Sequence, residues 1–232
     1  MLEQEFEALK TYDWGTSPKV LDPIEQAAVA ALGDPAARKD LEARLCEVLK
    51  SAAPRAAKDY ACRQLRTIGT ATAVPALAPL LADEQLSHMA RYALERIPAP
   101  EADAALRAQL PKLTGKLKLG VIASLGARRE TPAVAPLAGL LGNADESVAH
   151  AAAHALGVIA TPAAEQALAT AKPPPGIRAA AVADSELACA EALLAAGRKG
   201  DAKTVYERLL KQAPPKPAKA AAELGLKACG AP

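Results

Sequence analysis

Residues 73–81 read AVPALAPLL, and residues 133–141 read AVAPLAGLL. Both stretches place apolar residues at helical spacing, and each is followed by a helical stretch of small residues centred on a leucine. These leucines recur about every 30 residues, a period typical of helical-repeat proteins. They are Leu65, Leu94, Leu125 and Leu156. The sequence therefore predicts a repeated unit of helix, short turn and helix.

Turn signals lie where such helix pairs need them. Thr131-Pro132 and Thr161-Pro162 each place a capping hydroxyl before a proline that suits the first helical position. Gly69 and Gly126 are expected to end helices, and Asp145 is expected to cap one. One helix pair cannot bury both of its faces, whereas stacked pairs share a continuous core. We therefore expect an all-α protein, an α-solenoid of stacked antiparallel helix pairs.

The runs AVPALAPLLAD…LSHMARYALERIP and AVAPLAGLLGNADESVAHAAAHALGVI resemble bacterial HEAT-like repeats of the phycobilisome-lyase type. The resemblance covers residues 36–180 and implies a HEAT-like superhelix. Repeats of that family occur mainly as interaction modules, often as one segment of a larger protein. A minority of helical-repeat proteins are pigment lyases or DNA glycosylases. The resemblance thus implies a protein-binding scaffold and leaves an enzyme or enzyme accessory factor as the alternative.

Residues 181–232 have a different pattern. Ala202, Tyr206, Leu209 and Pro214 resemble the second half of a tetratricopeptide repeat, in which a small residue, an aromatic residue and a closing proline recur at these offsets. Residues 216–228 are predicted to form a capping helix. We divide the chain into an N-terminal helical cap (1–35), HEAT-like repeats (36–180) and the tetratricopeptide-like pair with its capping helix (181–232). Within the cap, Trp14 is expected to cover the end of the repeat stack.

Composition narrows the function classes. The chain has 232 residues, a net charge of +2 and only 3% aromatic residues, which argues against a nucleic-acid partner. No apolar run is long enough for a membrane span. We expect a cytoplasmic protein by default, with export left open if a leader peptide was removed. Residues 1–34 carry two basic and seven acidic residues, whereas residues 198–232 carry eight basic and three acidic ones. These opposite charges allow head-to-tail association.

Alignment on the core leucines predicts a concave row of polar and aromatic residues, which comprises Arg63, His88, Tyr92, His150 and His154. The row lies opposite the apolar stripe of each second helix. We expect it to bind a protein or peptide, with Tyr92 as the anchor. The alternative is a solvated helix face. His150 and His154 are four residues apart, but a zinc site needs further ligands, so no metal is expected.

We find no known catalytic motif, and we expect neither catalytic residues nor a cofactor. The function predicted from sequence is therefore a non-enzymatic interaction scaffold. A bilin lyase or chaperone, or a DNA glycosylase, remains the alternative on the family resemblance. Cys46 and Cys62 lie on consecutive predicted helices, where they form either a disulfide or two buried thiols. Cys189 and Cys229 are not assigned a partner.

Overall fold

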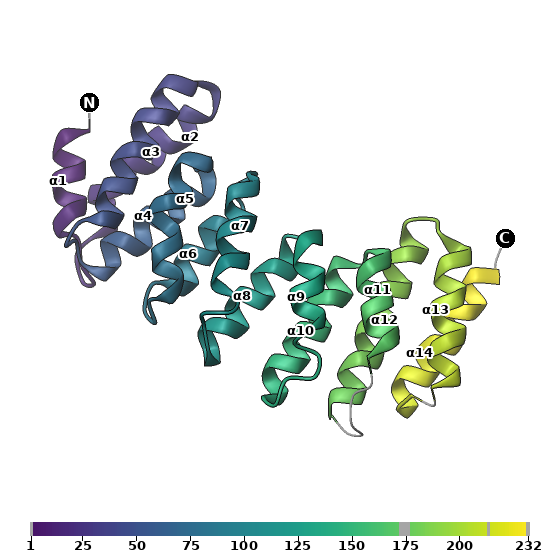
Figure 1. Ribbon diagram of the computed structural model, residues 1–232. Coiled ribbons are helices and arrows are strands. Elements are labelled where there is room, and N and C mark those ends of the chain that lie inside the picture. Colours follow the sequence, from purple (N-terminus) through teal and green to yellow (C-terminus); the bar gives the residue numbers. More distant parts are fainter. Residues whose placement is uncertain (1, 172–176, 213, 231–232) are drawn as a thin grey trace. The chain divides into compact units, whose positions relative to one another are not determined.

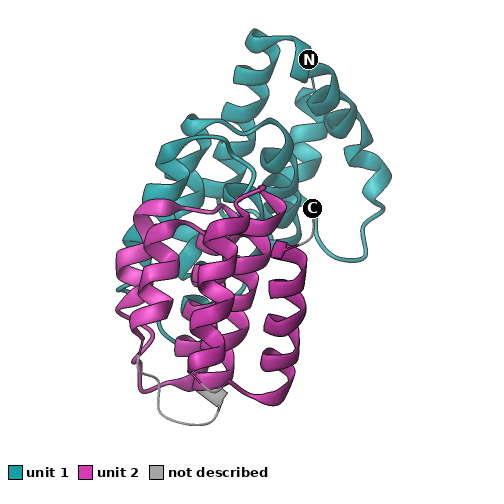
Figure 2. Ribbon diagram, turned by 90° about the vertical axis from the view of Figure 1, so that its right-hand side faces the viewer, with its two compact units in different colours: residues 1–121 teal, residues 122–232 magenta. Residues whose placement is uncertain are grey.

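The computed structural model describes residues 2–171, 177–212 and 214–230 (Figure 1). In this part of the chain there are fourteen α-helices, five short 3₁₀ helices and no strand. The predicted all-α class is therefore confirmed. The chain divides into two compact units, residues 1–121 and 122–232 (Figure 2), which are described separately below.

Unit 1 consists of helices joined by short turns. Its α-helices are α1 (Glu3–Thr11), α2 (Asp22–Ala30), α3 (Pro35–Lys50), α4 (Arg55–Ile68), α5 (Val74–Leu77), α6 (Ser87–Leu94) and α7 (Pro100–Gln109). Its 3₁₀ helices are η1 (Pro18–Leu21), η2 (Ala31–Gly33), η3 (Ala71–Ala73) and η4 (Ala78–Ala82). Helix α8 (Gly115–Ala127) crosses the boundary between the units.

Unit 2 also consists of helices that pack on one another. It contains η5 (Thr131–Ala133), α9 (Val134–Ala138), α10 (Glu146–Ile159), α11 (Pro162–Thr170), α12 (Ile177–Ala195), α13 (Lys199–Lys211) and α14 (Lys216–Gly230). Helices α12, α13 and α14 pack on one another, and α10 packs on α12. Among the helices described in either unit, none is long and apolar enough to cross a membrane.

The core leucines occupy the positions expected from their spacing. Leu65, Leu94, Leu125 and Leu156 are all fully buried, and Leu187, one further period along the chain, is buried as well. Burial of a leucine removes a large apolar surface from water and stabilises the fold. The periodicity thus identified these buried leucines correctly.

Two of the three predicted helix caps are formed, whereas Thr131 is the first residue of the 3₁₀ helix η5 rather than its cap, and that helix start has no side-chain cap. The Asp145 carboxylate accepts a hydrogen bond from the Ser147 amide at the start of α10. The Thr161 hydroxyl accepts one from the Ala164 amide at the start of α11, which has Pro162 as its first residue. Each side chain satisfies an amide that has no partner within the helix.

The stretch AVPALAPLL differs from the prediction of a regular helix. Residues 73–81 do not form one continuous helix but divide into the end of η3, α5 and most of η4. Pro75 and Pro79 lie inside this stretch, and a proline has no amide hydrogen for the regular helical hydrogen bond. The expected helix is therefore replaced by one short α-helix between two 3₁₀ helices.

Gly126 was expected to end a helix, but α8 continues to Ala127. The glycine instead allows a close approach of α10, because a Cβ atom at this position would lie 3.0 Å from Cα of Ala155. Gly157 of α10 has the same role, since its Cβ would lie 3.0 Å from the backbone oxygen of Ser185. These two glycines let neighbouring helices of unit 2 pack backbone to backbone.

The prediction that Trp14 covers the end of the stack is wrong, since 63% of this side chain is exposed. The loop between α1 and η1 carries Trp14 away from the core, whereas Phe6 of α1 is buried. The guanidinium of Arg44 lies 4.1 Å from the centre of the Phe6 ring. A cation thus covers this aromatic ring.

Three of the residues quoted from the C-terminal segment lie in one buried cluster. Ala202, Tyr206 and Leu209 are buried in the core formed by α12, α13 and α14. The Tyr206 ring lies against the backbone of Gly225, where a Cβ would come within 2.2 Å of the ring. The sequence KPPPG at residues 172–176 predicts a kink between helices, but this stretch lies outside the described residues. All four cysteines are free, so the alternative of a Cys46–Cys62 disulfide is not formed.

Candidate partner-binding surface

Helices α4 and α6 pack against each other in unit 1 and bring together three of the five predicted site residues. Arg63 lies on α4, and His88 and Tyr92 lie one turn apart on α6. Arg63 and His88 are exposed, whereas Tyr92 is half-buried. Both Arg63 and His88 are close enough to the Asp59 carboxylate to act on it electrostatically. We call Asp59, Arg63, His88 and Tyr92 the α4–α6 surface.

Asp59 is the unusual member of the α4–α6 surface because it is only 5% exposed. Its Oδ2 atom lies 3.7 Å from Nε of Arg55. Its Oδ1 atom is buried and has no hydrogen-bond partner among the described residues. Burial raises the pKa of this carboxyl group, while the charges of Arg55, Arg63 and His88 lower it. Buried oxygens of this kind normally have a hydrogen-bond donor.

His88 is positioned by Arg91, one turn further along α6. Nη2 of Arg91 lies 3.4 Å from Nδ1 of the imidazole. Arg91 also donates to the Gly120 carbonyl oxygen at 3.3 Å, and it lies 3.9 Å from the Glu95 carboxylate. Burial lowers the pKa of Arg91. These contacts give Arg91 a structural role beneath the surface.

Tyr92 is held by a cation on the neighbouring helix. The guanidinium of Arg66 lies 4.5 Å from the centre of the Tyr92 ring, a distance suited to a cation–π interaction. Since α4 and α6 pack together, this contact fixes the ring at the junction of the two helices. Helical periodicity placed Arg63 and Tyr92 on the row but did not identify Arg66, because the pairing joins two helices.

The other two predicted site residues lie in unit 2. His150 and His154 are exposed on α10, one turn apart. The opposite side of α10 is the buried apolar stripe, which consists of Val148, Ala152, Ala155, Leu156 and Ile159. The predicted division of this helix into two faces is therefore confirmed. Among the described residues, no three histidine, cysteine, aspartate or glutamate side chains are grouped so that they could hold a metal ion. His150 and His154 therefore have no third ligand beside them in this part of the chain.

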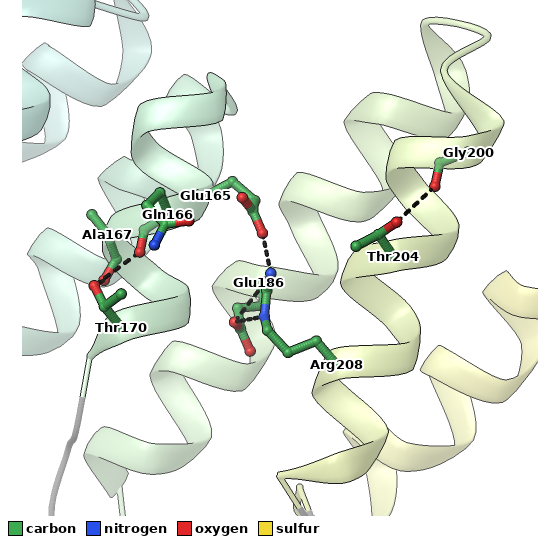
Figure 3. Close-up of polar contacts among 8 residues, drawn as sticks. All are labelled: Glu165, Gln166, Ala167, Thr170, Glu186, Gly200, Thr204 and Arg208. Atoms are coloured by element: carbon green, nitrogen blue, oxygen red, sulfur yellow. Dashed lines mark hydrogen bonds and ion pairs between the residues drawn. The ribbon is translucent and has the colours of Figure 1, made fainter.

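A second polar cluster in unit 2 was not predicted. Arg208 of α13 lies between Glu165 of α11 and Glu186 of α12 (Figure 3). Its Nε and Nη2 atoms donate to Oε1 of Glu186 at 3.3 and 2.9 Å, and its Nη1 atom donates to Glu165. The three residues join three helices and are far apart in sequence, so no local motif indicates them.

Electrostatics suggest a structural role for this cluster. Glu186 is fully buried, and its pKa is raised by burial and lowered by the charge of Arg208. Burial alone lowers the pKa of Arg208, but hydrogen bonding to Glu165 and the charge of Glu186 outweigh it, so this pKa is raised. The guanidinium therefore keeps its charge and compensates the buried carboxylate.

Beside the cluster is a pocket of about 160 Å³, lined among others by Thr161, Glu165, Cys189 and Thr204. Burial, with the nearby carboxylates Glu165 and Glu186, raises the pKa of the Cys189 thiol to about 12. Burial likewise raises the pKa of Cys46 to about 11 and that of Cys62 to about 12. A nucleophilic cysteine needs the opposite shift.

Comparison with known protein families finds no model that matches the chain, and comparison with curated proteins finds no relative. The HEAT-like and tetratricopeptide-like resemblances therefore depend only on the motifs quoted above.

Proposed function

We propose that this chain is a non-enzymatic scaffold that binds a protein or peptide on the concave face of a HEAT-like α-solenoid. In this proposal, α4, α6, α8 and α10 are second helices of successive pairs, and α12–α14 form a tetratricopeptide-like end. The all-α fold and the buried leucines at a period of about 30 residues support this arrangement.

The observation that carries the proposal is the unpartnered Oδ1 atom of Asp59. This oxygen is buried beside exposed Arg63 and His88, and its desolvation is not compensated by a hydrogen bond within the described residues. A donor from a bound partner would compensate it. Tyr92, fixed by Arg66, offers a broad ring and a hydroxyl group on the same pair of helices.

The chemistry of the surface defines the partner. A peptide that fits it presents an amide, hydroxyl or ammonium donor to Asp59 and places an apolar side chain on the Tyr92 ring. Tyrosine and arginine are enriched among residues that contribute most to interface affinity. Nothing in the described residues favours the lyase or glycosylase alternative, and the raised thiol pKa values argue against cysteine nucleophiles.

The proposal is tested with peptides selected from a random displayed library on the full chain. Selected peptides are then titrated against the wild type, Tyr92→Ala and Asp59→Asn, with Lys112→Ala as an exposed control outside the α4–α6 surface. Truncation of Tyr92 is expected to weaken binding about fivefold or more, which corresponds to a loss of about 1 kcal/mol. Asp59→Asn keeps the size of the side chain and replaces one acceptor oxygen with a donor, so it should also weaken binding.

One outcome of the titrations would contradict the proposal. Unchanged affinity for Tyr92→Ala and for a combined His88→Ala and His150→Ala variant would remove the concave row as the contact surface. Far-ultraviolet circular dichroism of each variant establishes that the helices are intact before affinities are compared.

A further inference from the structure

Exposed large apolar side chains are concentrated near the two ends of the chain. Among the described residues they are Trp14, Val20, Val29, Leu32 and Leu224. Four of them lie in residues 1–34, which carry two basic and seven acidic residues. The fifth lies in residues 198–232, which carry eight basic and three acidic ones. Contiguous exposed apolar residues commonly mark interaction sites.

The first of these regions is an outward face of α2 and η2, which we call the acidic face. Asp22, Glu25, Val29 and Leu32 follow one another at intervals of three or four residues, so they share one side of the helical segment. Val29 is 62% exposed and Leu32 is 55% exposed, whereas Ile24 on the opposite side is fully buried.

The acidic face carries two carboxylates without a salt-bridge partner among the described residues, as well as exposed apolar side chains. Neither Asp22 nor Glu25 forms a salt bridge with a cationic side chain among the described residues. Both carboxylates and Val29 line a groove of about 300 Å³, in which Arg63 contributes a cation to the wall beside Tyr60. Two carboxylates followed by two apolar residues therefore form a surface suited to a basic amphipathic helix.

The outward side of α14 has the complementary composition, and we call it the basic face. Lys216, Lys219, Leu224 and Lys227 are exposed, and Leu224 is 65% exposed. One exposed carboxylate, Glu223, lies on the same side among the three lysines, so this side carries three cations and one anion. The inward side of α14 carries Ala222, which is buried against α12 and α13. No described element of the chain covers Leu224 or the lysines around it.

We propose that the acidic face of one copy binds the basic face of a second copy. The charged residues have the same spacing on the two faces, three residues from Asp22 to Glu25 and three from Lys216 to Lys219. With the two helices side by side and parallel, each carboxylate lies opposite a lysine. In this register Val29 lies beside Glu223, while Leu224 lies on the adjacent side of α14 together with Lys227. Charge complementarity of this kind fixes the register of an interface.

The two faces are different surfaces, so the contact is heterologous. Each copy that binds through one face still offers the other, and a contact that does not close into a ring adds copies without limit. The proposal therefore predicts open head-to-tail assemblies rather than a dimer of fixed size. It concerns residues outside the α4–α6 surface except for Arg63, and its outcome is independent of the peptide-binding proposal.

The test is sedimentation velocity of the full chain over a range of protein concentrations. The mean mass of the wild type is expected to rise with concentration beyond that of two copies, and to fall when salt screens the charges. Variant A carries Val29→Glu and Leu32→Glu, and variant B carries Leu224→Glu. Each is expected to stay monomeric alone. The control is Lys112→Glu, an exposed charge reversal outside both faces, which should assemble as the wild type does.

The decisive arm mixes variants A and B. Variant A retains a basic face and variant B retains an acidic face, so the mixture is expected to form one-to-one complexes that stop at two copies. The proposal is overturned by a wild type that remains monomeric at about 1 mM, by a wild type whose mass levels off at two copies, or by a mixture that does not associate. Because the substituted side chains are exposed, circular dichroism should show unchanged helix content in each variant.

Discussion

Replacing Arg208 with methionine should destabilise unit 2, because among the described residues it is the cation that pairs with the fully buried Glu186 carboxylate. Glu186 would lose hydrogen bonds from Nε and Nη2 of Arg208, at 3.3 and 2.9 Å. Its Oε2 atom already has no hydrogen-bond partner among the described residues, so both oxygens would be left without a donor. Removing one partner of a buried pair costs about 3–5 kcal/mol. Since Arg208 is about a quarter exposed, water reaches the site and we expect the lower end of that range.

The size of this effect depends on pH in a definite direction. Burial already raises the pKa of Glu186, and loss of the Arg208 charge would raise it further. An unfolded glutamate loses its proton near pH 4.3, below the pKa of the folded group. The unfolded state then binds fewer protons than the folded state between those two values, so stability falls as pH rises through them. Arg208→Met should therefore cost more at pH 7 than at pH 5.

Urea unfolding followed by far-ultraviolet circular dichroism measures both effects. Glu186→Gln in the Arg208→Met background removes the buried charge while keeping the side-chain size, so it should recover a large part of the lost stability at pH 7. A loss below about 1 kcal/mol for Arg208→Met would place this pair among weakly contributing surface ion pairs. That result, or an equal loss at pH 5 and pH 7, would refute the electrostatic reasoning.

Three further predictions concern packing and the buried thiols. Leu125→Ala should cost about 2–5 kcal/mol in urea unfolding, and hydrogen exchange should increase first in α8 and α10, whereas uniform changes would contradict a repeat stack. Gly225→Ala should lower the melting temperature, since its Cβ would lie 2.2 Å from the Tyr206 ring, while Gly200→Ala in open space should stabilise α13 by up to about 1 kcal/mol. Stability should fall as pH rises above about 9, because unfolded thiols ionise there while burial raises the folded pKa of Cys62 to about 12. Cys62→Ala should reduce this alkaline loss in urea titrations at pH 8 and pH 10, and an identical loss would show that the thiol does not contribute.

Local periodicity was sufficient to identify the helices that carry the repeated leucines and the burial of those leucines. A residue such as Leu156 is buried because the apolar stripe of α10 repeats every three or four residues, and that spacing is visible in the sequence. Capping by Asp145 and Thr161 was also predictable, since the groups involved are only two or three residues apart. Interactions between residues within one helical turn can be predicted from the sequence without knowledge of the fold.

Interactions between different helices could not be predicted from local sequence patterns. Arg208 meets Glu165 and Glu186 only because α11, α12 and α13 pack together. The exposure of Trp14 has a similar origin, since the direction of its loop depends on how α1 and η1 pack rather than on the composition of the loop. Gly126 looked like a helix end, but its role is to admit Ala155 of a neighbouring helix.

The α4–α6 surface depends both on spacing within one helix and on contacts between two helices. Helical spacing placed Arg63, His88 and Tyr92 away from the buried stripes of their helices, and in the structure Arg63 and His88 are exposed while Tyr92 is half-buried. The buried oxygen of Asp59 and the stacking of Arg66 on Tyr92 arise between α4 and α6, so only the structure reveals them. Helical spacing therefore predicted that Arg63 and His88 are accessible, whereas the contacts that hold Tyr92 depend on how α4 and α6 pack.

Hydrogen–deuterium exchange of the full chain with and without a selected peptide tests the location of the binding surface most directly. The proposal predicts slower exchange in α4 (Arg55–Ile68) and α6 (Ser87–Leu94) when the peptide is bound, with little change in α3 and α7. The same peptide at the same concentration should give no such protection in Tyr92→Ala. Protection confined to α2, α5 or α7, with α4 and α6 unchanged, would contradict the assignment of the α4–α6 surface.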